Sequence, residues 1–96
     1  MGDGAERERK KHYKEKIMEI LIIFRTRTQT VRCANMLSAA GYRANVTDAP
    51  LTLYGSCTLA VRTDREGFSY FARRAQTFSS FYGAFSSDGG KYTRIF

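Results

Sequence analysis

The sequence is poor in the residues and runs that mark several large classes of protein. Its 96 residues include one proline, one histidine, two cysteines and no tryptophan. Its longest apolar run, Ile20 to Phe24, is far shorter than the ~18 residues that cross a membrane. Eight glycines without a repeat exclude a collagen-like chain, and a hydrophobic content of 43% excludes a chain too polar to fold. What remains is the composition of one small globular domain.

The same scarcity limits metal and redox chemistry. A zinc site needs about four ligands, whereas the chain offers His12, Cys33 and Cys57, with no Cys-x-x-Cys pair. We therefore expect neither a metal nor a cofactor. The charged start of the chain has no apolar segment of the kind found in secretory signals, which predicts a cytoplasmic protein with reduced thiols and no membrane partner.

Positive charge is the most prominent feature that is present. The chain carries 16 Lys and Arg against 9 Asp and Glu, a net charge of +7. Residues 1–16 mix both signs with no apolar periodicity, which predicts a flexible charged N-terminal tail. Over residues 17–96 nearly every cation is arginine, whose planar guanidinium suits carboxylates and phosphates. This balance fits attraction of nucleic acid or an acidic partner, and it equally fits a role in solubility alone.

Hydrophobic periodicity divides the rest of the chain into strands and helices. An isoleucine-rich run indicates a strand buried on both faces. Thr26 to Thr28 offer hydroxyl caps for a first helix, in which Val31, Ala34 and Leu37 recur at three-residue steps with Cys33 and Ala40 on the same apolar side, and Gly41 follows as a C-cap. Pro50 breaks the second strand, and Gly89-Gly90 predicts the turn of a closing hairpin. The predicted strands are 17–25, 42–47, 57–62, 81–86 and 91–96, the predicted helices are 28–40 and 68–76, and 51–56 is predicted to be a loop.

The order of these elements predicts the fold class. It is β-α-β-β-α-β followed by a short strand, the order of a split βαβ arrangement. We therefore predict a single α+β domain over 17–96, a ferredoxin-like βαββαβ two-layer sandwich with a C-terminal β-hairpin extension. In that fold three segments meet at one end of the sheet. The sequence thus predicts that residues 25–28, 50–57 and 77–80 are neighbours.

Cys57 is the residue on which this prediction bears most. At that sheet end it would face the N-terminus of the first helix, whose free N–H groups stabilise an anion. Arg25 and Arg27 flank the same turn, and Thr28 could hydrogen-bond a thiolate, so we expect the pKa of Cys57 to lie below that of an ordinary thiol. The alternative is a small buried hydrophobic residue. Cys33, on the apolar side of the first helix, is predicted to be core packing, with a resolving thiol as the alternative.

The sequence resembles, in two segments, the selenium/sulfur carrier protein-like family of small bacterial proteins. These segments are ILIIFRTRTQTVRCANMLSAAGY at 20–42 and VTDAPLTLYGSCTLAVR at 46–62. Members have a proline loop that ends in a serine-cysteine pair before an apolar strand, and Pro50, Ser56 and Cys57 match it. At Leu51 and Thr58 the chain departs from the family, which often has arginine and glycine there.

The resemblance implies a carrier whose cysteine holds a persulfide or perselenide. Cys57 would be the carrier thiol, and the partners would be a sulfur or selenium donor and an acceptor. The predicted binding residues around it are Arg25, Arg27, Thr28, Pro50 and Ser56. No catalytic base is evident, since His12 lies in the tail, so the sequence favours a carrier or binding module over an enzyme.

Two other functions stay open. Some ferredoxin-like domains stack bases on aromatic side chains of the sheet. The candidates for such a platform are Phe81, Tyr82, Phe85, Tyr92 and Phe96, with Arg94 nearby. Alternate aromatic residues also fill cores, however, and a basic-aromatic RNA-binding motif is missing. The other alternative is an interaction module, because the hairpin at 81–96 leaves an edge strand through which two copies could pair as a homodimer.

Overall fold

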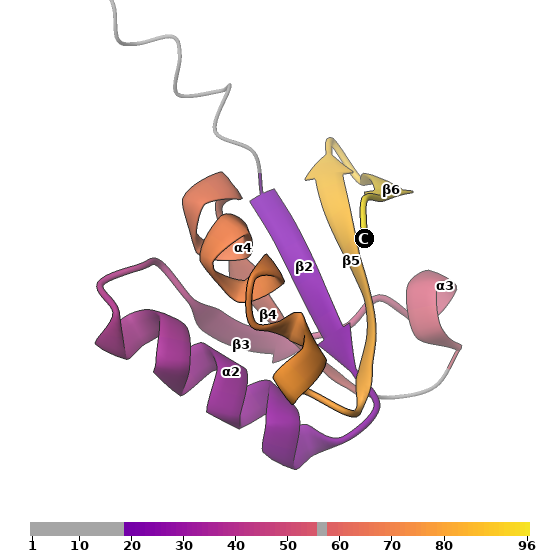
Figure 1. The fold of residues 1–96 in the computed structure, drawn as a ribbon. Coiled ribbons are helices and arrows are strands. Elements are labelled where there is room, and N and C mark those ends of the chain that lie inside the picture. The colour runs from indigo at the N-terminus through magenta and orange to yellow at the C-terminus, as the bar shows by residue number, and fades with distance from the viewer. Residues whose placement is uncertain (1–18, 56–57) are drawn as a thin grey trace, which may run out of the picture.

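The computed structural model describes residues 19–55 and 58–96, so the predicted tail at 1–16 lies outside the described residues. In chain order the elements are β2 (Glu19–Phe24), α2 (Arg27–Ala39), β3 (Asn45–Asp48), α3 (Leu51–Tyr54), β4 (Leu59–Thr63), α4 (Arg65–Ala72), the 3₁₀-helix η2 (Ala75–Thr77), β5 (Phe81–Asp88) and β6 (Lys91–Arg94) (Figure 1).

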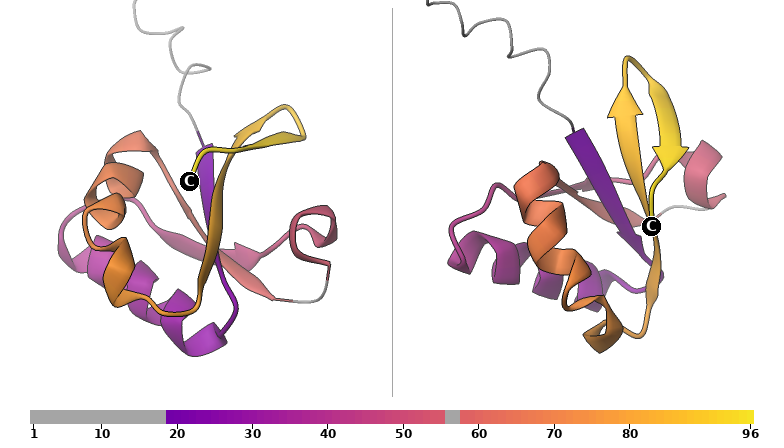
Figure 2. Two further views of the ribbon diagram at one scale, coloured as in Figure 1. Left: turned by 45° about the vertical axis from the view of Figure 1, so that its right-hand side comes forward. Right: turned by 45° about the horizontal axis from the view of Figure 1, so that its top comes forward.

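The described strands form one antiparallel sheet in the order β3-β4-β2-β5-β6. β2 is the central strand and pairs with β4 on one side and β5 on the other. Helices α2 and α4 lie against one face of the sheet, whereas α3 and the β5–β6 hairpin project on the opposite side (Figure 2). The predicted α+β class is confirmed.

The sheet separates two apolar clusters, because successive side chains of a strand point to opposite faces. Ile20, Ile22 and Phe24 belong to the larger cluster, which packs against α2 and α4. Leu21 and Ile23 belong to the smaller one, on the face where α3 packs. Each fully buried side chain of this size stabilises the fold by roughly 1.5–3 kcal/mol. Burial of β2 on both faces explains why its sequence shows no polar alternation.

A register shift in β5 decides which of its aromatic residues share a face. Ile23 pairs with Gly83, but Phe24 pairs with Phe81, which leaves Tyr82 as an extra residue in the ladder. A bulge of this kind breaks the strict alternation of a strand. Tyr82 and Phe85 are three residues apart, yet both pack with the smaller cluster.

Helix α2 begins and ends within one residue of its predicted bounds. The Thr26 side chain accepts a hydrogen bond from the N–H of Gln29 and caps the start. At the other end Gly41 adopts a φ of 92°, and the N–H of Tyr42 donates to the carbonyl oxygen of Leu37. This Schellman arrangement requires a left-handed residue, which is why a glycine ends the helix.

The buried face of α2 differs from the predicted one at two positions. The helix buries Thr30, Cys33, Ala34 and Leu37. Val31, which we expected on the apolar face, is 42% exposed, and Ala40 is exposed as well. The period of 3.6 residues explains the error, since steps of exactly three drift away from the buried face.

The segment after Pro50 is a helix, whereas the sequence predicts a loop there. Helix α3 spans a single turn, with Pro50 at its N-cap and Gly55 at its C-cap with a φ of 88°. Proline suits the start of a helix, since it has no N–H to leave unpaired. Local spacing missed this turn because four residues are too few to show a helical period.

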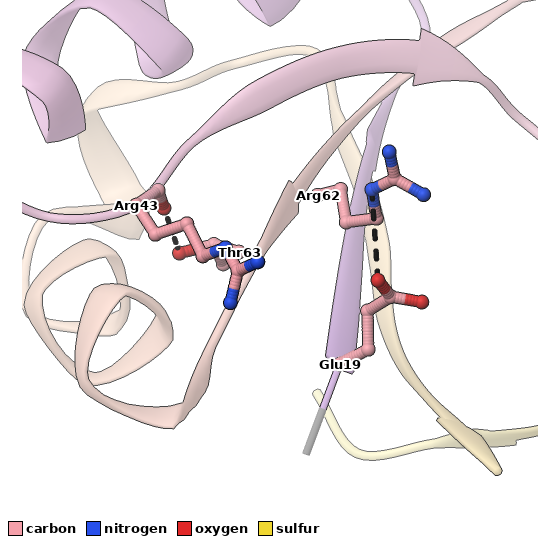
Figure 3. A network of polar contacts seen from close by, with 4 residues as sticks. All are labelled: Glu19, Arg43, Arg62 and Thr63. Carbon is pink, nitrogen blue, oxygen red and sulfur yellow. Dashed lines mark hydrogen bonds and ion pairs between the residues drawn. The ribbon is translucent and has the colours of Figure 1, made fainter. Parts of the chain in front are cut away.

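The second predicted helix is displaced towards the N-terminus. Helix α4 begins at Arg65, because Asp64 caps it by accepting a hydrogen bond from the N–H of Gly67. Strand β4, which precedes this helix, ends at Thr63, one residue beyond its predicted end. The Thr63 hydroxyl donates to the carbonyl oxygen of Arg43 (Figure 3). The expected helix at 68–76 is therefore wrong at both ends, and η2 follows α4 as a separate turn.

Within the described part of the chain, no helix is long and apolar enough to cross a membrane.

Candidate functional site

The end of the sheet where β2 stops brings together two of the three predicted segments directly. The N–H of Arg25 donates to the carbonyl oxygen of Ser80 at 2.7 Å, and the hydroxyls of Thr26 and Ser80 are 2.9 Å apart. Residues of the loop between β2 and α2 therefore contact the segment before β5. This is the predicted contact between 25–28 and 77–80.

Gln29 completes this contact from the first turn of α2. Its Oε1 accepts hydrogen bonds from both the N–H and the hydroxyl of Ser80, at 2.8 and 2.9 Å. Its Nε2 donates to the hydroxyl of Ser79 at 3.1 Å. The start of α2 and the start of β5 are thus fixed by side-chain bonds, each of which contributes about 0.5–1.5 kcal/mol. Sequence reasoning missed Gln29, because no local motif marks a pairing partner fifty residues away.

Thr58, the residue directly after the third predicted segment (50–57), reaches the same end of the sheet. Its hydroxyl donates to the carbonyl oxygen of Phe24 at 3.3 Å, and its own carbonyl oxygen accepts from the N–H of Ala49 at 2.9 Å. Pro50, a predicted binding residue, is half-buried beside this contact. Ser56 and Cys57 lie outside the described residues, so the bonds of Thr58 and the cap at Gly55 are what the structure shows on either side of them.

The predicted arginines occupy two different places. Arg25 is exposed, donates to the carbonyl oxygen of Phe81 at 3.5 Å, and lies 5.5 Å from the ring centroid of Tyr82. Arg27 and Thr28 are exposed in the first turn of α2, where the helix dipole is positive. Arg25 is therefore directed towards the face of the sheet that carries α3. Arg27 and Thr28 lie instead on the exposed surface of the first turn of α2.

A tyrosine of α3 links that short helix to the same face. The rings of Tyr54 and Tyr82 meet edge to face, with centroids 4.8 Å apart and planes at 89°. Such a pair contributes about 0.5–1.5 kcal/mol beyond its buried area. No local pattern marks Tyr54, because its partner Tyr82 is brought near only by the bulge in β5.

Cys33 is a core residue, as predicted. It is fully buried in the larger cluster with Leu37 and Phe71. Burial raises the pKa of the Cys33 thiol from the ordinary 9.0 to about 12, and the charge of Arg32 offsets a small part of that rise. A thiol that holds its proton so strongly is a poor nucleophile.

The predicted aromatic platform does not form as one surface. Phe81 packs with the larger cluster, and its ring contacts that of Phe96, which in turn contacts Phe68 of α4. Tyr82, Phe85 and Tyr92 lie on the other side of the sheet. The twofold alternation of the strands, modified by the bulge, divides the five aromatic side chains between opposite faces.

Comparison with protein-family models, with curated proteins and with solved structures finds no match for this chain. Over residues 19–55 and 58–96, no group of three His, Cys, Asp or Glu side chains is placed to hold a metal ion.

Proposed function

We propose that the protein is a sulfur or selenium carrier, or a thiol-based accessory protein, in which Cys57 holds a persulfide or perselenide. The proposal also takes the fold as a ferredoxin-like βαββαβ arrangement. The central position of β2 between β4 and β5 supports this, with α3 and β6 as additions to the basic unit. The reactive thiol would need a reducing compartment such as the cytoplasm.

The observation that carries the proposal is the convergence of three segments at one end of the sheet. The bonds of Ser80 to Arg25 and Gln29 and of Thr58 to Phe24 join the end of β2, the start of α2, the start of β5 and the start of the β4 segment. Cys57 directly precedes Thr58 in the chain. A thiolate near this junction would be stabilised by the positive end of α2 and by nearby guanidinium groups.

Besides the Cys57 thiolate, the transfer step needs a persulfide on the donor protein. The Cys57 thiolate would attack the terminal sulfur of a persulfide on the donor. A new sulfur–sulfur bond forms to Cys57 as the donor's sulfur–sulfur bond breaks, and the donor leaves as a thiolate, so that protons and electrons balance. Arg25 and Arg27 would stabilise the anion, Thr28 and Ser56 would offer hydroxyls, and Pro50 would shape the loop. In this role the protein accepts and passes on sulfur rather than turning over a substrate.

Intact-protein mass spectrometry after incubation with a cysteine desulfurase and cysteine tests the proposal. We expect the wild-type chain to gain the mass of one sulfur atom, which a reducing agent removes. The Cys33→Ser variant should still gain it and the Cys57→Ser variant should not. Unmodified wild-type protein, or equal loading of Cys57→Ser, would refute the carrier role. Replacing cysteine by selenocysteine in the same assay distinguishes selenium from sulfur as the cargo.

The second candidate is a protein-interaction module without chemistry, and the sheet edges favour it. Among the strands that the structure describes, each of β3 and β6 pairs with a single neighbour, so the backbone groups along its outer edge have no partner in this part of the chain. A homodimer could form by pairing of these edges. Light scattering at rising protein concentration tests this, and a monomer throughout would exclude a stable dimer.

A further inference from the structure

Strand β3 has one side of its backbone without a partner among the strands that the structure describes. It pairs there with β4 alone, and the N–H of Ala49 donates to the carbonyl oxygen of Thr58 where that ladder continues. Hydrogen-bonded pairs alternate along an antiparallel ladder. Thr47 therefore bonds towards β4, whereas the N–H and C=O groups of Val46 and Asp48 point away from it.

The same edge of β3 carries an exposed valine. Val46 is 43% exposed and lies directly opposite Val61, which belongs to the larger cluster. Because directly opposite residues of an antiparallel pair share a face, Val46 lies on the face that α2 and α4 cover (Figure 2). An apolar side chain beside outward-pointing backbone groups makes this edge suitable for pairing with a further strand.

Val31 of α2 lies along the same edge. It is 42% exposed and is two residues, about 200° of helix, from Gln29. Gln29 bonds to Ser80, just before β5. Since β5 and β3 lie on opposite sides of β2, the flank of α2 that carries Val31 faces the side of the sheet on which β3 lies. Two exposed valines therefore border this one edge.

The charges at the two ends of β3 are of opposite sign. Arg43 lies shortly before the strand and Asp48 ends it, and both are exposed. The ion pair within residues 19–55 and 58–96 joins Arg62 to Glu19 at 3.6 Å and involves neither of them (Figure 3). Two copies of one strand that pair about a twofold axis run antiparallel. The basic end of each copy then lies beside the acidic end of the other.

The outer strand on the opposite side of the sheet lacks this complementarity. β6 begins at Lys91 and ends at Arg94, so both of its ends are basic. Antiparallel pairing of two copies of β6 would set like charges together, which is unfavourable. Of the two outer strands that the structure describes, β3 is thus the one suited to pair with itself.

We infer that two copies of this chain associate through β3, with Val46 of one copy directly opposite Val46 of the other. Hydrogen-bonded pairs between the copies form only where the N–H and C=O groups point outwards. In this register Asp48 pairs with Ala44 of the other copy and lies next to its Arg43. The two sheets become one, and both copies of α2 lie on the same face of it with their Val31 flanks towards each other.

The neighbouring registers are less favourable. A pairing centred on Thr47 sets the carboxylate of Asp48 against Val46 of the other copy. It also sets Ala44 against Pro50, which has no N–H to donate. A pairing centred on Asp48 sets two carboxylates against each other. Each shift changes which side chains meet, so charge and backbone together specify one register.

This inference rests on the second candidate function, in which sheet edges pair, and it does not involve Cys57. Sedimentation equilibrium and native mass spectrometry of the full chain test it, with a reducing agent present so that no dimer depends on a disulfide. The variants Arg43→Glu and Asp48→Lys each place like charges at both ends of the paired strands. At low salt we expect each variant alone to dimerise about tenfold or more weakly than the wild type.

An equal mixture of these two variants is the decisive sample. It should form a heterodimer with about the affinity of the wild type, because the mixed pair restores opposite charges at both ends. Arg43 and Asp48 stand at opposite ends of the strand, so a rescue of this kind comes from contact between copies. Both side chains are exposed, so neither substitution disturbs the core.

A substitution at the centre of the interface provides a second test. Val46→Lys puts two like charges opposite each other and should abolish the dimer. Its matched control is Thr93→Lys, which adds the same charge at an exposed position of β6 and should dimerise within about twofold of the wild type. Circular dichroism melting checks that each variant folds, and should Val46→Lys unfold, the mixing experiment still decides.

Three results would overturn the inference. The first is a wild-type chain that stays monomeric at every concentration, as it would if another segment or another protein occupied this edge. The second is a mixture that associates no better than either variant alone, and the third is a dimer that Thr93→Lys breaks and Val46→Lys leaves intact. Sulfur loading of Cys57 in a monomeric wild type would refute this interface alone. A dimer with the expected responses that takes up no sulfur would refute the carrier alone.

Discussion

Gly67 is required by the side chain that it faces rather than by its own backbone. A Cβ at this position would overlap the hydroxyl oxygen of Thr63, which is buried and bonded to the carbonyl oxygen of Arg43. Moving that hydroxyl would break the bond and leave the buried Thr63 hydroxyl without its acceptor. The first turn of α4 can approach the end of β4 only because residue 67 has no side chain.

We predict that Gly67→Ala lowers the free energy of unfolding by roughly 1–3 kcal/mol, as overpacking does. Alanine favours a helix over glycine by about 0.8–1.0 kcal/mol, so the expected sign opposes propensity. Urea unfolding measures the change. In the background of Thr63→Ala the same substitution should cost much less, because the oxygen it meets is gone. Equal costs in both backgrounds would show that the two positions do not clash.

Because of Cys33, the free energy of unfolding should fall as pH rises in the alkaline range. Burial raises the pKa of its thiol from 9.0 to about 12, so between these values the folded protein keeps a proton that the unfolded chain loses. The stabilising contribution is therefore complete below the unfolded pKa and is lost as pH rises towards the folded one, by about 1.4 kcal/mol per pH unit.

The prediction is that wild-type protein loses more stability than Cys33→Ala as pH rises through this range. Urea unfolding of both proteins at several pH values measures the difference, in which the shared titration of tyrosine and lysine cancels. Parallel curves for the two proteins would mean that Cys33 reaches solvent in the folded state.

The position of helix α2 on the sheet is set by its buried face, and its two ends are set by capping residues. Leu37 is fully buried under the sheet, whereas Val31 is 42% exposed. The helix ends could be predicted from Thr26 and Gly41, since caps are local. The choice of buried face was wrong at Val31, because neighbouring residues of similar hydrophobicity give several possible faces and only packing selects one.

We expect Leu37→Ala to lower the free energy of unfolding by roughly 2–5 kcal/mol through the cavity that it leaves. Val31→Ala is the matched control on the same helix and should change it by less than about 0.5 kcal/mol. Chemical denaturation measures both. Similar losses at the two positions would contradict the orientation of α2 in this structure.

The whole molecule assembles its candidate site from segments that are distant in sequence. Arg25 follows β2, Ser80 precedes β5 and Thr58 precedes β4, and their hydrogen bonds close the same end of the sheet. Strand β2 ends here, and β4 and β5 begin here, because both neighbours run antiparallel to the central strand. The charges that would act on Cys57 therefore depend on the fold as a whole.

Alkylation by iodoacetamide as a function of pH tests that dependence. We predict that Cys57 reacts near neutral pH while Cys33 reacts only after denaturation, because a thiolate reacts and a buried thiol does not. Arg25→Ala with Arg27→Ala should shift the Cys57 profile to higher pH, and added salt should shift it the same way by screening. Peptide mapping assigns the label to each cysteine. A Cys57 that reacts only in denaturant would be a core thiol, and the carrier proposal would fail.

The sequence by itself determined the features that depend on neighbouring residues. The run Ile20 to Phe24 predicted a buried strand, Thr26 and Gly41 bounded a helix, and the order of elements predicted the α+β class and the meeting of the loop after β2 with the start of β5. Each of these is set by pattern, caps or strand direction, which are legible over a few residues.

Only the tertiary structure decided which side chains meet across the sheet. The bulge in β5 puts Tyr82 beside Arg25, Arg94 and Tyr54, and the twofold alternation sends Phe81 to the opposite face. The physical reason is that one extra residue in a strand reverses the facing of every residue beyond it. Pairing between strands sets that register, and no local pattern records it.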